Sequence, residues 1–160
     1  MNVDSEKELH ANATLLRQLY SSLNLHQPRV MSECYHEQAT FHDIAFDLSG
    51  KEEISAMWQM ICRGDIRATF EVLSADANTG VVRLVDEYTF TDTGRRVRNE
   101  IESRFRFRDG LIIEHCDSCD PKAWADAALG GVTGFLAGRF RFLRAWKARG
   151  KLRRFRAGQF

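Results

Sequence analysis

Apolar residues recur every three or four positions through the first part of the chain, and this spacing predicts three helices. The first covers residues 8–23. The second begins at Pro28, whose fixed φ suits the first turn of a helix, and ends near residue 36. The third follows Ser49 as its N-cap and ends at Gly64.

Alternating polar and apolar positions replace the helical spacing after Ile66 and predict strands. Two of the intervening turns, Asp92-Thr93-Gly94 and Asp109-Gly110, contain the residue types typical of β-hairpins. Hairpin connections between successive strands indicate an antiparallel meander. The expected segments are strands over Arg67–Leu73, Val81–Thr91, Arg96–Arg108 and Leu111–Cys119, a shorter strand over 39–43, and an irregular stretch over 46–49.

Helices followed by an antiparallel sheet favour an α+β domain in which the helices pack on one face of the sheet. A short final helix is expected from Asp120, a natural N-cap, and Pro121, its first residue. We therefore predict one domain over residues 1–130, followed by an extension over 131–160.

Composition agrees with a single domain, because 160 residues with 44% hydrophobic content are enough for a core of ordinary size. No apolar run has the length of a membrane span, and residues 1–10 do not resemble a signal peptide, so a cytoplasmic location is expected. The cysteines should then remain reduced thiols. Cys116 and Cys119 have the CxxC spacing but no second ligand pair, so neither a metal site nor a redox role is expected.

Charge is distributed unevenly along the chain. Residues 1–130 hold 14 Lys and Arg against 22 Asp and Glu, whereas residues 131–160 hold nine basic residues and no acidic one. The extension also carries aromatic residues, which favours a basic amphipathic helix. It could dock on an acidic domain or make a weak contact with an anionic membrane surface, and no motif supports binding to nucleic acid.

Ionisable residues stand at positions where the pattern predicts apolar side chains. His42 and Asp43 follow Phe41, and alternation puts His115 and Asp117 on one inward face of the last strand. Such groups indicate either a ligand pocket, or a corner exposed to water and a His–Asp pair that satisfies itself. Alternation in 96–108 places further polar residues inside, namely Asn99 and Ser103.

The order of elements, the run from Tyr35 to Asp43, and the segment Gly50-Lys51-Glu52-Glu53-Ile54 resemble the nuclear transport factor 2-like superfamily. The likeness is to its ketosteroid isomerase and polyketide-cyclase (SnoaL-like) branches, and it extends to the last strand, Gly110 to Asp120. The resemblance implies a cone-shaped fold, with helices closing a strongly curved, mainly antiparallel sheet around an apolar pocket. It also implies a homodimer formed through the sheet.

By position, Asp43 matches the general base of the isomerases, and Tyr20 matches their oxyanion-hole tyrosine. Ser103 stands where the second donor of the isomerases would be, and it is a weaker donor. The cyclases resemble this chain at His115 and the nearby Asp117. The resemblance therefore implies cofactor-free proton transfer on an apolar carbonyl compound, as in an isomerase or cyclase.

Two other functions stay open for the same fold. One is a non-catalytic module that binds an apolar ligand or a partner subunit, and the other is hydrolysis of epoxides, since paired aspartates can activate water. The expected catalytic residues are Asp43, His115, Asp117 and Tyr20. The expected substrate-binding residues are Phe41, His42, Phe46, Trp58, Phe70, Asn99 and Ser103.

Overall fold

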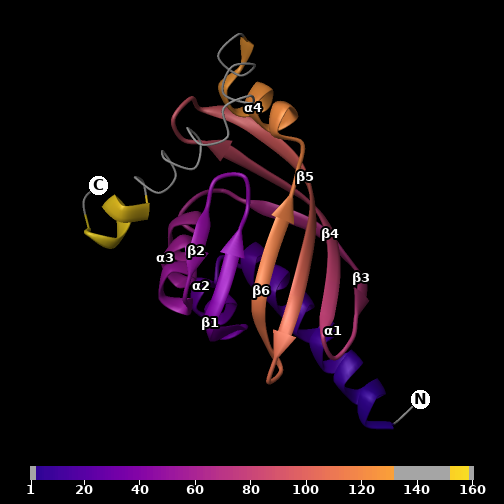
Figure 1. Cartoon of the computed structure of the whole chain (residues 1–160). Helices are drawn as coiled ribbons and strands as arrows, with labels where there is room; N and C mark the ends of the chain where they lie inside the picture. The colour runs from indigo at the N-terminus through magenta and orange to yellow at the C-terminus, as the bar shows by residue number, and fades with distance from the viewer. Residues whose placement is uncertain (1–2, 132–151, 159–160) are drawn as a thin grey trace.

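A computed structural model describes residues 3–131 and 152–158, with side chains described from residue 11 onward in the first segment. Within residues 3–131, four helices and the strands of a six-stranded sheet follow one another in the predicted order (Figure 1). The helices are α1 Val3–Asn24, α2 Pro28–Glu33, α3 Lys51–Ile61 and α4 Pro121–Leu129. The strands are β1 Tyr35–His42, β2 Asp47–Ser49, β3 Arg67–Ala75, β4 Thr79–Phe90, β5 Arg95–Arg108 and β6 Leu111–Ser118.

The predicted meander is confirmed, because β3 to β6 pair in succession as antiparallel strands in the sheet order β2-β1-β6-β5-β4-β3. The parallel pairing of β1 with β6 was not predicted. Parallel neighbours depend on contacts between distant segments, which local turn chemistry does not reveal. The stretch 46–49 is also more ordered than expected, because Asp47–Ser49 pairs with the end of β1.

The second and third helices differ from the prediction at their ends. The second ends at Glu33, three residues early, because the backbone N–H of Cys34 closes the last turn and β1 begins at Tyr35. The third has Gly50, with a φ of 92° that suits a glycine, and not the predicted Ser49 as its N-cap, and it ends at Ile61 rather than at Gly64. The side chain of Glu53 accepts from the backbone N–H of Ser49 at 3.0 Å. At α4 the expected cap is confirmed, because the Asp120 carboxylate accepts from two backbone N–H groups.

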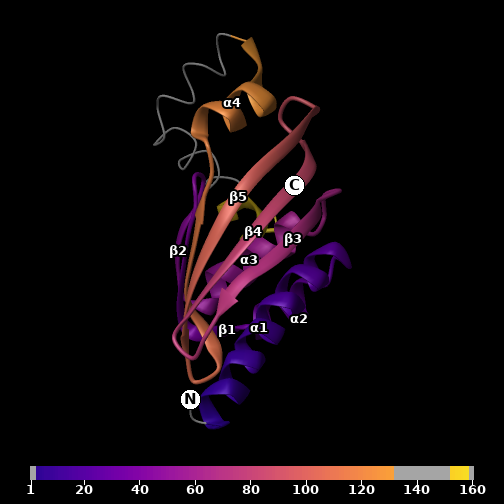
Figure 2. The same cartoon turned by 90° about the vertical axis from the view of Figure 1, so that its right-hand side faces the viewer.

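The helices and the curved sheet enclose a main core, and a smaller core lies beneath α4. In Figure 2, α1 runs along the face of the sheet beside β3, and α4 lies at the other end of the sheet, next to the end of β5. The smaller core is built around Val97 and Trp124. The inner face predicted for β5 is confirmed, since Val97, Asn99, Ser103, Phe105 and Phe107 are buried.

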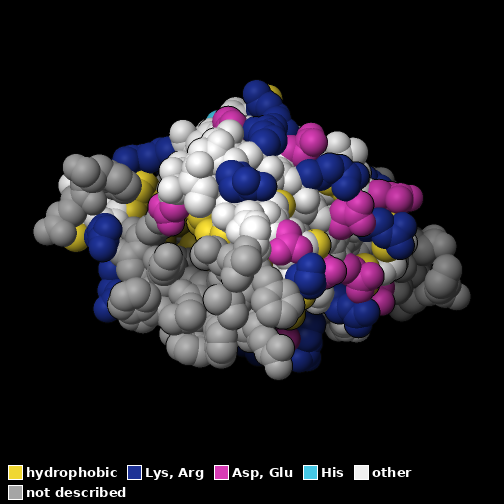
Figure 3. All heavy atoms as spheres, turned by 90° about the horizontal axis from the view of Figure 1, so that it is seen from above, with side chains coloured by type: hydrophobic (Ala, Val, Ile, Leu, Met, Phe, Trp, Pro, Cys, Tyr) yellow, Lys and Arg dark blue, Asp and Glu magenta, His cyan; other side chains and the backbone are white. Residues whose placement is uncertain are grey.

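The outer face of the sheet carries opposite charges that pair within the chain. Arg98 contacts Glu100 at 2.8 Å, and Arg106 contacts Glu114 at 3.2 Å. Seen from the α4 end, basic and acidic side chains lie next to one another, with hydrophobic side chains visible only in small areas between them (Figure 3). The homodimer expected through this face stays a prediction.

The end of the basic extension docks on the domain in the part that the structure describes. Leu152 is buried in the main core, Arg156 contacts Glu52 at 2.6 Å, and the guanidinium of Arg63 lies 4.4 Å from the ring centre of Phe155. Among the described helices, none is long and apolar enough to cross a membrane. The predicted contact with a membrane surface falls mainly on 132–151, outside the described residues.

Candidate functional site

A buried imidazole on β6 is held between two side-chain partners. Nδ1 of His115 lies 2.8 Å from the Tyr35 hydroxyl, and Nε2 lies 2.8 Å from Oδ1 of Asp117. The indole N–H of Trp58 donates to the same Tyr35 hydroxyl at 3.2 Å. The parallel pairing of β1 with β6 makes this contact possible, because it places Tyr35 beside the strand that carries His115.

A second arm of hydrogen bonds reaches Asp117 from the other side. Ser103 and Asp117 are partners in the β5–β6 register, and the Ser103 hydroxyl donates to Oδ1 of Asp117. The Tyr20 hydroxyl, from α1, donates to the Ser103 oxygen at 2.8 Å. Tyr20, Ser103 and His115 are all buried. We call the six residues of the two arms the polar network: Tyr20, Tyr35, Trp58, Ser103, His115 and Asp117.

Hydrogens can be assigned along the whole polar network. An indole nitrogen only donates, so the Tyr35 oxygen accepts from Trp58 and its own hydrogen goes to Nδ1 of His115. Nε2 of His115 then carries the ring hydrogen and donates to Asp117. Both arms therefore deliver a hydrogen to one oxygen of Asp117.

Burial keeps the two tyrosines of the polar network protonated. Removal from water is the main reason that the pKa of Tyr20 and of Tyr35 is raised well above its ordinary value. The hydroxyl hydrogens of Tyr20 and Ser103 are already donated within the network. Stabilisation of an enolate by Tyr20, the role that the resemblance implies, stays a prediction that requires this hydroxyl to turn away from Ser103.

Asp43 lies in the turn between β1 and β2 and is held by the backbone. Its Oδ1 accepts from the N–H groups of Ala45 at 2.7 Å and Phe46 at 2.5 Å, so the carboxyl group is fixed by the turn it closes. Burial raises the pKa of Asp43 to about 7, and the charge of Asp117 contributes in the same direction. The two backbone hydrogen bonds oppose this rise. A carboxyl group with a pKa near neutrality can both take up and release a proton.

Asp86 is a third acid of this region, and the sequence analysis missed it. It lies on β4 opposite Asn99 in the β4–β5 register and is only 9% exposed. Burial, followed by the charges of Asp117 and Asp43, raises the pKa of Asp86 to about 7. Alternation with the buried Val82 and Leu84 was the signal that could have placed it on the inner face.

Asp43, Asp86 and Asp117 form what we call the acidic cluster. The charge of Asp117 raises the pKa of both other acids, and the charge of Asp43 also raises the pKa of Asp86. The amide of Asn99 hydrogen-bonds to the thiol of Cys119, whose pKa is raised mainly by burial. Within the part of the chain described, no group of three or more His, Cys, Asp or Glu side chains is arranged to hold a metal ion. The cluster thus combines Asp117, which accepts two hydrogen bonds, with two acids whose pKa is raised to about 7.

The other predicted binding residues lie in different surroundings. His42 is 45% exposed and lies 3.7 Å from Asp47, at the edge of the sheet. The ring of Phe70 is partly buried and packs on Tyr20, with ring centres 5.4 Å apart. Phe41 and Trp58 belong to the main core and pack against His115. Phe46 is also buried there and supplies a backbone N–H to Asp43.

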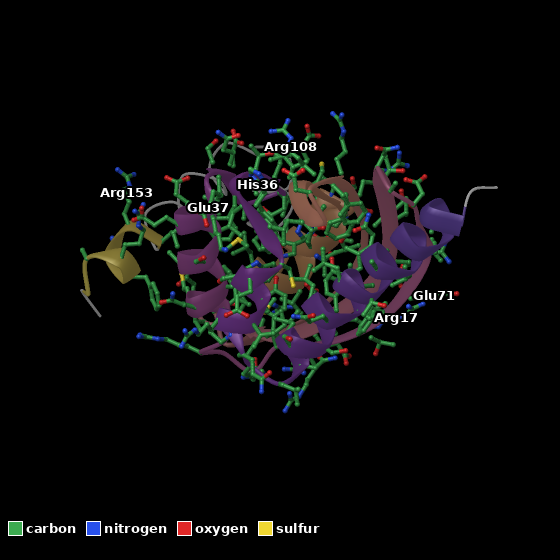
Figure 4. All side chains as sticks on the ribbon, turned by 90° about the horizontal axis from the view of Figure 1, so that it is seen from below. Arg17, His36, Glu37, Glu71, Arg108 and Arg153 are labelled. Carbon is green, nitrogen blue, oxygen red and sulfur yellow. The ribbon has the colours of Figure 1, made fainter. Side chains whose placement is uncertain are left out.

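Charged side chains away from the acidic cluster lie on the periphery. Viewed from the end opposite α4, labelled residues such as Arg17, Glu71 and Arg108 extend outward from the densely filled interior (Figure 4). All three are exposed. The buried or half-buried acids of the cluster are therefore distinct in their surroundings from these exposed charges.

Comparison with known proteins places this geometry in a family context. The sequence model of the SnoaL-like domain matches residues 16–115. No curated protein matches the sequence. Many solved structures match the fold.

Three of these structures illustrate the likeness. A candidate polyketide cyclase from Silicibacter sp. TM1040 has 17% identity and a TM-score of 0.66, covering 75% of this chain and 96% of its own. An LEH-like epoxide hydrolase from M. tuberculosis has 14% identity and a TM-score of 0.64, with 81% and 97% covered. TsrD from Streptomyces laurentii has 18% identity and a TM-score of 0.65, with 76% and 97% covered. At such low identity the likeness shows the fold, and it confirms the predicted nuclear transport factor 2-like cone.

Proposed function

The chain belongs to the SnoaL-like domain family, and we propose that it is a cofactor-independent catalyst that transfers a proton on an apolar carbonyl compound. The observation that carries this proposal is the state of Asp43. It is a half-buried acid with a pKa of about 7, fixed by two backbone N–H groups through a single oxygen. A general base works best when its pKa lies close to the working pH, and Asp43 meets this condition.

In this mechanism Asp43 removes a proton from the carbon next to the carbonyl group and later returns it to another carbon. This shift needs no oxidant, metal or cofactor, because the proton passes only between the substrate and Asp43 and the electron pair of the C–H bond stays in the substrate. Asp117 supports the reaction as a fixed negative charge that raises the pKa of Asp43. His115 positions Asp117 through Nε2 and is itself positioned by Tyr35.

The proposal can be tested without knowing the natural substrate. β-Tetralone, an apolar bicyclic ketone, is incubated with the protein in D₂O, and NMR follows the replacement of its α-hydrogens by deuterium. We expect the wild-type protein to accelerate this exchange and Asp43→Asn to lower the acceleration between about 10²- and 10⁴-fold, because an amide cannot act as a base at neutral pH.

Asp47→Asn is the matched control, since Asp47 lies four residues further along and its side chain is 64% exposed. We expect this variant to exchange like the wild type. Equal exchange by wild type and Asp43→Asn would exclude Asp43 as the base. If β-tetralone binds but none of its hydrogens exchange above the rate in buffer, the protein acts as a binding module on this ligand.

Epoxide hydrolysis is the second candidate, and a different observation favours it. Asp43 and Asp86 both have a pKa of about 7, so at neutral pH one can be ionised while the other is protonated. An ionised carboxylate can deprotonate water as it attacks an epoxide carbon, while an acid protonates the oxygen released from that carbon. One structural neighbour bears the name of an epoxide hydrolase. Hydrolysis of styrene oxide to its diol without exchange of β-tetralone would favour this function over isomerisation.

A further inference from the structure

Asp86 is a buried acid with one side-chain oxygen that the described fold leaves without a hydrogen-bond partner. Its Oδ1 is inaccessible to water and has no hydrogen-bond partner among the described residues. In contrast, Oδ1 of Asp43 and Oδ1 of Asp117 each receive two hydrogen bonds. An unpartnered buried oxygen costs free energy unless a bound molecule supplies the missing partner.

The position of Asp86 indicates where such a molecule would bind. Asp86 lies opposite Asn99, on the inner face of β4 and β5, and the charges of Asp43 and Asp117 act on it. Apolar side chains border the cluster at both ends, in the main core on one side and in the smaller core under α4 on the other. A ligand that contacts Asp86 would thus be largely apolar with one polar atom.

We propose that Asp86 is a second catalytic residue of this site, which donates its proton to the carbonyl oxygen of the substrate while Asp43 removes the proton from the neighbouring carbon. This assignment rests on the proposed proton-transfer function and extends it to a named acid. The Asp43 carboxylate takes the α-proton, and the C–H electron pair becomes the C=C bond of an enol. The carbonyl π electrons move to oxygen, which takes the proton of Asp86. In the second half Asp43 returns its proton to carbon and Asp86 recovers its own from the enol.

The surroundings of Asp86 favour its protonated form before substrate binds. The titratable groups whose charges interact with Asp86 are all acids, so none supplies a positive charge that would hold it ionised. They come from α1, the β1–β2 turn, β4 itself, β6 and the segment after it: Tyr20, Asp43, Tyr88, Asp117 and Cys119.

The polar network cannot perform this step in the arrangement observed. The hydrogens of Tyr20 and Ser103 are donated toward Asp117, and the Tyr35 hydrogen goes to His115. Asp86 is therefore the acid of this region that is free to donate to a bound oxygen. Its role complements that of Asp43, since a base and an acid acting on adjacent atoms avoid the build-up of charge on the substrate oxygen.

The test compares Asp86→Asn and Asp86→Leu with Glu87→Gln, which changes the next residue of β4, an exposed one. The exchange of β-tetralone in D₂O is measured against pH for each protein. Wild-type exchange should fall at low pH, where Asp43 gains a proton, and at high pH, where Asp86 loses one; the two apparent pKa values belong to the coupled pair. Asp86→Asn should lower exchange about 10²-fold and abolish the fall at high pH. Asp86→Leu, which has no donor, should lower exchange further, and Glu87→Gln should match the wild type.

The outcomes separate this assignment from the function on which it rests. Exchange by Asp86→Asn at the wild-type rate, with the fall at high pH intact, overturns the role of Asp86 and leaves Asp43 as the base. A wild-type profile that does not fall at high pH also overturns it, and this result does not depend on whether any variant folds. Absence of wild-type exchange on bound β-tetralone overturns the proposed function together with the assignment.

Discussion

The polar network and Asp86 both place polar side chains inside one sheet, but they differ in how many of their polar atoms have hydrogen-bond partners. In the network, donors and acceptors match from Trp58 through His115 to Tyr20. Oδ1 of Asp86 has no partner among the described residues. A satisfied network needs no ligand to explain it, whereas an unpaired buried acid does. The comparison shows that burial of an ionisable group alone does not identify a reactive one.

The two regions differ because the helices cover them differently. α1 and α3 contribute Tyr20 and Trp58, which supply donors to the network from above the sheet. In the smaller core, which Tyr88 of the same strand borders, the indole N–H of Trp124 is already donated to the Tyr88 hydroxyl at 2.7 Å. That N–H is therefore not available to a carboxyl group at this end of β4. Chemistry is consequently expected at this end rather than at His115.

Replacing His115 gives the largest expected effect and tests the structural side of the comparison. His115→Leu leaves the Tyr35 hydroxyl without its acceptor and removes one donor from Asp117 in a fully buried place. We expect the free energy of unfolding to fall by about 3 kcal/mol. Urea denaturation at neutral pH measures it. His42→Leu is the control, because His42 is half exposed, and it should change stability by less than about 0.5 kcal/mol. Equal losses in the two variants would contradict a structural role of the network.

Replacing Asp86 has the next largest expected effect on the free energy of unfolding, and it should raise this free energy rather than lower it. The pKa of Asp86 is raised from 3.8 to about 7, so between these values the folded protein keeps a proton that the unfolded chain releases. Stability should therefore decrease as the pH rises from about 4 to 7 and stay low above it. This pKa change corresponds to a loss of about 4 kcal/mol in the free energy of unfolding once Asp86 is ionised. Asn carries no charge but still buries a polar amide, so we expect Asp86→Asn to be more stable than the wild type by about 2 kcal/mol at pH 8.

Thermal unfolding of Asp86→Asn and wild type at pH 5 and pH 8 checks this prediction. The gain should be present at pH 8 and much smaller at pH 5, because wild-type Asp86 is protonated there. Glu87→Gln should show no comparable dependence on pH. A variant less stable than wild type at pH 8 would mean that the Asp86 carboxylate has a stabilising partner.

Removing the Tyr20 hydroxyl is expected to have the smallest effect on stability. It also tests whether Tyr20 belongs only to the polar network or takes part in the reaction. In Tyr20→Phe the Ser103 hydroxyl still donates to Asp117 and loses only a donor to its own oxygen. We expect a loss of about 1 kcal/mol in stability, measured by urea denaturation. If exchange of β-tetralone falls about as much as in Asp43→Asn, Tyr20 turns toward the substrate and has the role that the resemblance implies.

Much of the fold could be predicted because its signals are local. Alternation along β5 identified the inner residues Asn99 and Ser103, and Asp109-Gly110 marked the last hairpin correctly, with φ of 53° and 73°. The cap at Asp120 follows from its own side chain and the next two residues. Each of these features depends on neighbours within a few positions, so the amino-acid order is enough to predict them.

The candidate site could be predicted only in part. Asp43, His115 and Asp117 drew attention because polar residues interrupt apolar stretches. Asp86 did not, because Glu87 follows it and a strand with two adjacent acids looks like any half-exposed strand. The sequence did not reveal that His115 is paired on both nitrogens while Asp86 is not, because those contacts join segments up to 80 positions apart.

By itself, the amino-acid sequence determined the elements, the inner face of the longest strand and the α+β class, because burial of one face imposes a period of two or 3.6 residues. Tertiary structure alone decided which buried polar atoms are paired. The parallel contact of β1 with β6 brought Tyr35 to His115, and the β4–β5 register put Asp86 opposite Asn99. Hydrogen bonds act over about 3 Å and require direction, so their partners depend on how distant segments meet and not on the pattern within any one of them.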